Sequence, residues 1–349
     1  MSRRMTHTLW LLLTFGVPLA GMAFAYQPAE PLTVSASVRS LIPEVEPAYA
    51  ELVIPPLPAP VELDEGKVAL GRDLFHDPRL SRDGTISCAS CHDLARGGAD
   101  PRSRSLGVGG AEGKRNSPTV YNSIFNFRQF WDGRSESLWD QVDGPIHDPG
   151  EMDMTYEEIV TRLEEDSITR ERFVDLYGAG PTADSIRDAI VTFEASLVTL
   201  NSPFDRYLRG ESDALSAEAK RGYDLFRELS CVACHQGVNI GGNLFQRMGR
   251  VEAFFDPESE GADIGRFAVT GSPSDRYKFK VPSLRNVAIT APYFHDGSVP
   301  TLRIAVKLMA RHQLGYDISE EQLNAIVAFL ESLTGEIPES ARFGPRKKR

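Results

Sequence analysis

Cys88-Ala89-Ser90-Cys91-His92 and Cys231-Val232-Ala233-Cys234-His235 are two copies of one five-residue pattern, and they contain all four cysteines of the 349-residue chain. Two thiols one short turn apart can add to the two vinyl groups of a porphyrin, and the adjoining imidazole then reaches the iron from one face. A pair of disulfides or a Cys/His zinc site is the alternative, but neither requires a histidine directly after each second cysteine. The pattern therefore predicts two covalently bound c-type haems, with His92 and His235 as iron ligands.

The chain around the two haem motifs repeats in the same order, which predicts two domains of one kind. A stretch with helical apolar spacing precedes each motif, at residues 71–75 and 222–226. A second matching helix closes each half, at residues 189–193 and 325–329. We therefore expect a mainly α fold of two cytochrome c-like helical domains, each around one haem, with long loops and little sheet.

The predicted organisation has four parts: a signal peptide at residues 1–25, a proline-rich arm at 26–60, and two haem domains at 61–205 and 206–349. The arm has little helical periodicity, so we expect it to lie extended on the surface or on a partner subunit. Helix caps are expected at Asp184 and at Ser319, the latter with Gln322 as a capping box.

The first residues have the pattern of a secretory signal, because Arg3 and Arg4 precede a mostly apolar run. A membrane anchor is the alternative, but Gly16 and Pro18 interrupt the run. Since covalent haem attachment in bacteria also requires export, we expect a periplasmic protein without a membrane span after cleavage. Cleavage would change the net charge from −11 to −13, which argues against nucleic acid and favours a basic protein partner.

The sixth ligand of each iron decides what that haem does. An iron with an open position can take a small oxidant, whereas one closed by Met or His is built to pass electrons. For the second iron, spacing alone offers Met248 and Met309, and for the first it offers His147, Met152 and Met154. A methionine at helical spacing is usually core filler, so spacing does not rank these candidates.

Further motifs make the chain similar to the bacterial dihaem cytochrome c peroxidases, a group within the cytochrome c peroxidase and MauG superfamily. They lie at residues 85–92, 115–119, 129–134, 265–270 and 284–297. The resemblance implies an enzyme that reduces hydrogen peroxide to water with electrons from a small periplasmic donor, a cytochrome c or a cupredoxin. It also implies that one haem receives electrons, that the other takes the peroxide, and that the protein is a homodimer.

The same resemblance implies roles for individual residues. Met309 matches the methionine that completes the electron-receiving haem, and Trp131 matches the tryptophan between the two haems. Glu151 and Gln141 match the catalytic acid–base and the polar residue at the peroxide haem. A carboxylate held in an apolar haem pocket should have a raised pKa, which suits proton transfer.

A calcium site between the domains is also implied, by Asn116 and by the backbone of Thr290 and Pro292. One amide oxygen and two carbonyl oxygens suit calcium, but they leave much of the coordination shell to water. His295 matches a family histidine near the second haem, and we expect it to be a structural hydrogen-bond partner.

At one position the chain departs from the commonest family pattern. Related enzymes have a histidine there that ligates the peroxide haem in the resting state, and this chain has Val108 between glycines. Because valine has no lone pair, we expect an open first iron even in the oxidised protein, and a peroxidase that needs no reductive activation.

Two other functions remain possible on the sequence alone. One is a MauG-like oxidase that modifies another protein, against which Met309 argues because that branch has a tyrosine at this position. The other is a non-catalytic dihaem electron-transfer cytochrome, which would not turn over peroxide.

Overall fold

The computed structural model describes residues 40–254 and 262–342, which belong to one compact unit that spans residues 34–349. The predicted signal peptide at residues 1–25 and the first part of the proline-rich arm lie outside the described residues. Within the described ranges, no helix combines the length and apolar character that a membrane crossing requires.

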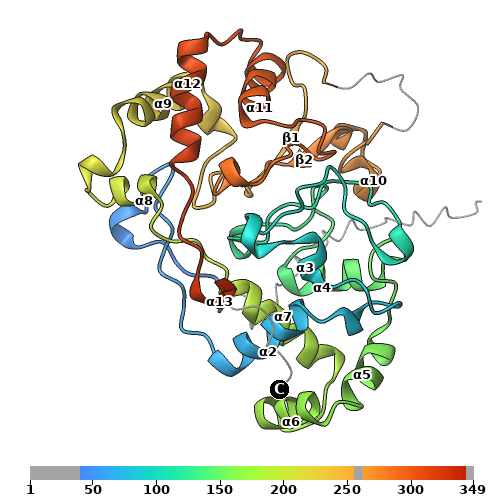
Figure 1. The fold of residues 1–349 in the computed structure, drawn as a ribbon. Helices are drawn as coiled ribbons and strands as arrows, with labels where there is room; N and C mark the ends of the chain where they lie inside the picture. The colour runs from blue at the N-terminus through green and yellow to red at the C-terminus, as the bar shows by residue number, and fades with distance from the viewer. Residues whose placement is uncertain (1–39, 255–261, 343–349) are drawn as a thin grey trace, which may run out of the picture. The chain divides into compact units, whose positions relative to one another are not determined.

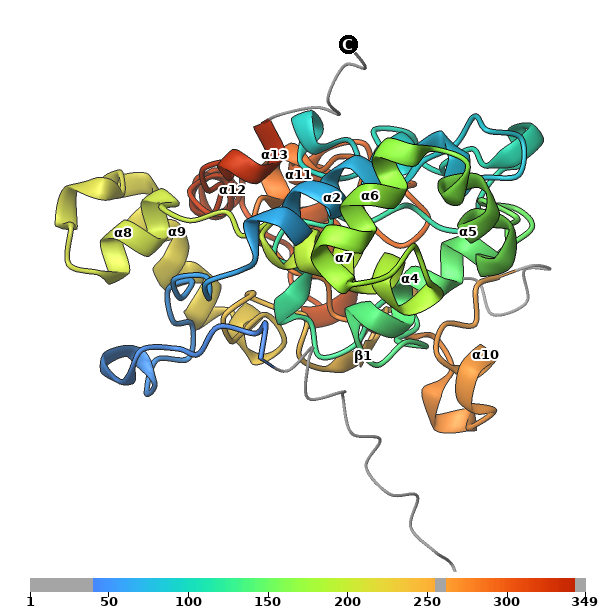
Figure 2. The same ribbon diagram turned by 90° about the horizontal axis from the view of Figure 1, so that it is seen from below.

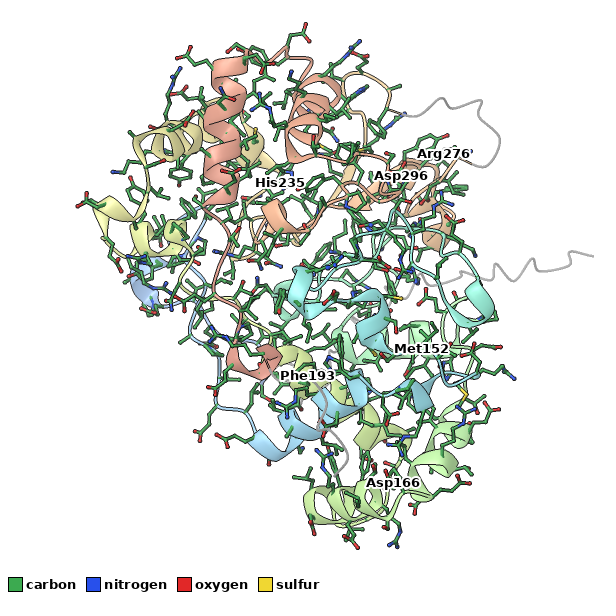
Figure 3. All side chains as sticks on the ribbon, viewed as in Figure 1. Met152, Asp166, Phe193, His235, Arg276 and Asp296 are labelled. Carbon is green, nitrogen blue, oxygen red and sulfur yellow. The ribbon has the colours of Figure 1, made fainter. Side chains whose placement is uncertain are left out.

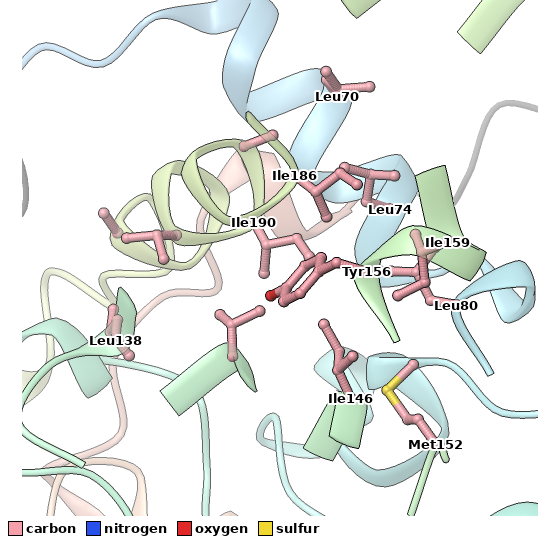
Figure 4. Close-up of a cluster of buried hydrophobic side chains, with 14 of the residues drawn as sticks. Leu70, Leu74, Leu80, Leu138, Ile146, Met152, Tyr156, Ile159, Ile186 and Ile190 are labelled. Atoms are coloured by element: carbon pink, nitrogen blue, oxygen red, sulfur yellow. The ribbon is translucent and has the colours of Figure 1, made fainter. Parts of the chain in front are cut away.

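The first half contains α2 (Glu65–Phe75), α3 (Cys88–Cys91), α4 (Leu138–His147), α5 (Tyr156–Glu164), α6 (Ser167–Tyr177) and α7 (Ala183–Ala195). Helices α2 and α7 cross closely in the lower part of Figure 1. A β-carbon on Gly71 would lie only 1.8 Å from the carbonyl oxygen of Ala189, so glycine is required at this crossing. The buried side chains below it surround Tyr156 and form the core of this half (Figure 4).

The second half contains α8 (Pro203–Leu208), α9 (Ala217–Glu228), α10 (Phe267–Thr270), α11 (Leu302–Met309), α12 (Glu320–Glu331) and α13 (Glu339–Arg342). Helices α9 and α12 repeat the crossing of α2 and α7, because a β-carbon on Gly222 would lie 1.9 Å from the carbonyl oxygen of Ala325. Phe226 and Phe329 belong to the core beneath them. The mainly helical, cytochrome c-like fold predicted from the sequence is therefore confirmed.

One short sheet is found among the described residues. Strands β1 (Phe245–Arg247) and β2 (Lys278–Lys280) pair antiparallel, with Phe245 opposite Lys280. They lie in the long loop between α9 and α11, in the region where the halves approach each other (Figure 1). The prediction of little sheet is confirmed.

One predicted helix cap is confirmed and the other is wrong. Ser319 caps α12, and Gln322 completes the capping box with bonds of 3.1 and 3.2 Å. Helix α7 is capped by Thr182 and not by Asp184, because the Thr182 hydroxyl accepts the backbone N–H of Ser185 at 3.1 Å. Asp184 lies inside the first turn, where its carboxylate suits the positive end of the helix dipole.

Part of the proline-rich arm is buried in the core of the second half, and the last described helix packs on the first half. In the proline-rich arm, Ile54 is 1% exposed in the second-half core, so this part of the arm is buried and does not only cover the surface. Helix α13 returns to the first half and lies beside α2 (Figure 2). The predicted boundary between residues 205 and 206 falls within α8, and the division into domains stays a prediction.

Candidate haem sites

A cavity of about 280 Å³ lies in the second half and reaches a wall formed by the first half. The haem motif lines it with Cys231, Cys234 and His235, and Met309 at the end of α11 lines it as well. Figure 3 shows His235 among the second-half side chains, with Met152 and Phe193 in the other half. The structure thus places the predicted thioether cysteines and the two predicted iron ligands of the second haem around one space.

The two motif histidines have the protonation behaviour that an iron ligand requires. Burial lowers the pKa of His92 and lowers that of His235 to about 4, although the backbone at Pro118 and Pro282 opposes this effect. Among the described residues, neither buried Nδ1 atom has a hydrogen bond of ordinary geometry. A neutral, buried imidazole beside two free thiols fits a covalently bound haem.

Both candidate methionines of the second half, Met248 and Met309, line the cavity. Met248 Sδ lies 3.9 Å from Nε2 of Gln313. Sulfur ligation by Met309 therefore stays a prediction from the resemblance.

The structure reveals a second internal repeat, in the turns that lead into α4 and α11. Its equivalent residues are separated by one constant offset along the chain, and the comparison of helices in the sequence had missed it. Asn122 and Asn286 both have left-handed backbone, with φ of 60° and 62°. Equivalent turns are then closed by bridges between Gln129 and Ser135 and between Tyr293 and Val299. Helices α4 and α11 start from the equivalent caps Ser137 and Thr301.

This repeat shows how the two halves differ at their haem sites. In its register, Pro145 of α4 occupies the position that Met309 occupies in α11. A proline side chain has no atom that can ligate iron. The first half therefore lacks a donor at the place where the second half offers sulfur.

Two loops of the first half meet at the predicted peroxide site. The Val108 N–H donates to the Glu151 carbonyl at 2.9 Å. Gly107 permits this approach, because a β-carbon there would lie 2.0 Å from the carbonyl oxygen of Gly150. Burial raises the pKa of both thiols of the first haem motif, and the charge of Glu151 adds to this effect. The structure thus brings Val108 and Glu151 together, as the sequence could not show.

The carboxyl group of Glu151 has the raised pKa expected from the sequence. Burial is the main cause, and the charge of Asp148 adds to it, whereas Arg134 acts in the opposite direction. Gln141 lies on α4, and the end of that helix leads into the Glu151 loop, where the Met152 N–H donates to the Pro145 carbonyl at 3.1 Å.

The other candidates for ligating the first haem iron pack against neighbouring side chains of the first half. Met152 and Met154 are 3% and 2% exposed and belong to the apolar core, where Figure 4 shows Met152 below Ile159 and Leu80. His147 is exposed at the end of α4, and its ring packs edge-on against Tyr156 at 5.5 Å.

Trp131 lies where the two halves meet. Its indole N–H donates to the Asn116 carbonyl at 2.9 Å, and its own carbonyl accepts the N–H of Lys280 at 2.7 Å. The ring is edge-on to buried His295, with 6.4 Å between centroids. Trp131 is thus bound by both halves and lines the cavity of the second haem.

The three residues of the predicted calcium site, Asn116, Thr290 and Pro292, line the same cavity. The Asn116 side chain donates through Nδ2 to the carbonyl oxygens of Arg102 and Ser103, at 3.0 and 3.3 Å. This orientation leaves its Oδ1 atom without a hydrogen-bond donor among the described residues, and the calcium site stays a prediction from the resemblance.

The sequence analysis missed two buried ionisable residues that form no ion pair with any described residue. Glu194 on α7 is 5% exposed, its Oε2 atom has no partner among the described residues, and burial raises its pKa to about 8. The sequence did contain a signal for Glu194. It directly follows the run at 189–193, and the residue at the matching position of the second half is the apolar Leu330. The second residue is Lys280 on β2, which lines the cavity.

Comparison with known proteins supports this description of the two halves. A family model for di-haem cytochrome c peroxidase matches residues 65–213, and a cytochrome c model matches residues 219–334. The matches support one c-type haem in each half.

The chain is 49% identical over 293 residues to cytochrome c peroxidase Ccp of Escherichia coli strain K12, covering 84% of this chain but only 63% of that longer protein. It is 43% identical to cytochrome c551 peroxidase of Nitrosomonas europaea, covering 82% of this chain and 85% of that one. Among solved structures, a MauG-like protein associated with microbial copper homeostasis superposes with a TM-score of 0.74 at 31% identity. That match covers 82% of this chain and 94% of the other.

Proposed function

Because this chain belongs to the family of di-haem cytochrome c peroxidases, we propose that it reduces hydrogen peroxide to water in the periplasm, as a homodimer, with electrons from a small cytochrome c or cupredoxin. We further propose that it needs no reductive activation. The observation that carries both proposals is the asymmetry of the halves. Met309 lines the cavity of the second half, and the first half has Pro145 and Val108, whose side chains have no atom that can ligate iron.

When bound, the haems supply the redox chemistry, and each peroxide takes up two electrons and two further protons to give two waters. Glu151 has the task of moving a proton from the near oxygen of peroxide to the far oxygen as the O–O bond breaks. Its raised pKa brings its proton affinity closer to neutral pH. Gln141 holds the peroxide by a hydrogen bond.

The electron path runs from the second half to the first through the contact at Trp131. A thioether ligand from Met309 raises the potential of a haem, which suits an electron acceptor. The hydrogen bonds of Trp131 to Asn116 and Lys280 hold it against both halves and support this role.

A calcium ion held by Asn116 and by the carbonyls of Thr290 and Pro292 would stiffen the same contact. Titration of chelator-treated enzyme with calcium tests this proposal. We expect a calcium-dependent change in haem absorption, and a titration without any change contradicts the site.

A MauG-like protein-modifying oxidase is the second candidate, supported by the likeness to the MauG-like structure and by the proposed open first haem. Met309 argues against it. Rapid mixing with peroxide separates the two functions, since a peroxidase returns to its resting spectrum as soon as reduced donor is present. A long-lived oxidised state that ignores the donor would favour the oxidase.

The decisive experiment combines spectroscopy with turnover. Electron paramagnetic resonance of the all-ferric enzyme should contain a high-spin signal from the first haem, and oxidised enzyme should consume peroxide without a lag when reduced cytochrome c is added. Low-spin signals alone would show that a protein group closes the first iron. If peroxide oxidises the donor no faster with the enzyme than without it, the protein is a non-catalytic electron carrier.

A further inference from the structure

Lys280 is a buried cation that has no anionic partner in the described part of the chain. It is 7% exposed, at the end of β2, and it lines the cavity together with Cys231, Cys234 and His235. Among the described residues, its ammonium group forms no ion pair or hydrogen bond, and burial lowers its pKa to about 8. An unpaired charge in so apolar a site costs several kcal/mol.

Other buried or nearly buried cations of the chain are paired. Arg285 binds Asp205 at 2.8 Å and two backbone carbonyls, and Arg115 binds Asp132 and Asp263 at 2.6 Å each. At the repeat position of Lys280 the first half has Asn116, whose side chain is fully engaged as a donor. The lysine is therefore unusual among the described cations, because no described residue supplies an anion to it and the cavity that it lines has room for a bound anionic group.

The chemistry of the expected cofactor supplies such a partner. A c-type haem is tied to its cysteines through the vinyl edge of the porphyrin, and its two propionates extend from the opposite edge. A haem attached to these cysteines would present its carboxylates to the wall of the cavity away from them. We propose that Lys280 pairs with a propionate of the haem attached at Cys231 and Cys234, and that it thereby holds the acidic edge of this haem beside Trp131.

The proposal has a consequence for the electron path. The backbone of Lys280 already binds Trp131, so the same residue would hold both the cofactor edge and the indole at the contact between the halves. Its ammonium would also offset the propionate charge, which favours the reduced haem. This role deepens the proposed function, but the ion pair itself does not require that peroxide be the substrate.

The test is a spectroelectrochemical titration of the holoenzyme without peroxide. Lys280→Met should lower the midpoint potential of the second haem by at least about 59 mV, a tenfold change in its one-electron equilibrium, and leave the first haem unchanged. Lys280→Arg should restore most of the potential. Lys278→Met is the matched control, since Lys278 lies on the same strand and pairs with Asp275 at 3.1 Å, and it should shift neither haem.

The potential of the Lys280→Met variant should also become pH-dependent, because a propionate without its cation takes up a proton more readily. If Lys280→Met does not retain haem, Lys280→Gln is titrated in its place. If the titrated variant has the wild-type midpoint potential of the second haem at every pH, the proposal is overturned. Since no turnover is measured, failure of the peroxidase assignment would leave this result standing, and the reverse also holds.

Discussion

At position 108, a histidine in place of valine would stand on the loop whose backbone binds the Glu151 carbonyl. We expect Val108→His to supply the missing nitrogen ligand and to close the first iron in the oxidised enzyme. The all-ferric variant should lose its high-spin resonance signal and should require prior reduction of the second haem before it turns over peroxide.

Val108→Leu is the control for this change, because it alters the side chain without adding a donor. It should keep the high-spin signal and immediate turnover. Immediate turnover by the histidine variant as well would show that residue 108 does not reach the iron.

Glu151 should control the acid side of the pH profile. Only the ionised carboxylate accepts a proton, so kcat/KM should fall as the pH drops through the raised pKa of Glu151. Glu151→Gln should lower kcat/KM by about 10²- to 10⁴-fold and remove this limb. Arg134→Gln should move the limb to higher pH, because Arg134 lowers the pKa of Glu151. An unmoved limb in the arginine variant would assign it to another group.

At the scale of elements, the two helix crossings are equivalent and should fail separately. A methyl group on Gly71 or Gly222 would meet a backbone carbonyl at under 2 Å, so the helices must move apart. Gly71→Ala should destabilise the first half, and Gly222→Ala the second, by about 1–3 kcal/mol each. Urea unfolding followed by the absorption of each haem measures this. If one variant lowered the unfolding midpoint at both haems equally, the two helix crossings would not be independent.

The helix caps show where local pattern suffices and where it fails. Ser319 and Gln322 were predictable because both partners of a capping box lie within one turn. Asp184 was a reasonable cap by residue type, but Thr182 and Ser185 form the capping box of α7 and leave Asp184 to pair with Arg187 at 2.9 Å. Competition between neighbouring polar side chains decides the cap, and composition does not reveal it.

For the whole molecule, an ion pair joins the two halves. Arg115 of the first half donates to both oxygens of Asp263 in the second, at 2.6 and 2.8 Å. Burial alone would raise the pKa of Asp263, but Arg115 lowers it below the usual value. This contribution to stability is therefore present at neutral pH and is lost as the pH falls through that lowered pKa.

Asp263→Asn should weaken the contact between the halves by about 1–3 kcal/mol and make unfolding less sensitive to acid. Denaturation followed at each haem should then resolve two transitions. Asp275→Asn, which removes the partly exposed partner of Lys278, is the control and should change stability by less than about 1 kcal/mol. Coincident transitions in the Asp263→Asn protein would mean that other contacts hold the halves together.

The sequence by itself determined the covalent chemistry and the helical plan of this protein. Cys88, Cys91 and His92, like their counterparts in the second half, act through neighbours within one turn, and helix periodicity is equally local. Only the tertiary structure decided that Val108 meets Glu151, that the turns before α4 and α11 are equivalent, and that Lys280 binds Trp131 through its backbone without an ion pair among the described residues. These relations join residues far apart in the chain, and they depend on how loops and halves pack, which no local spacing encodes.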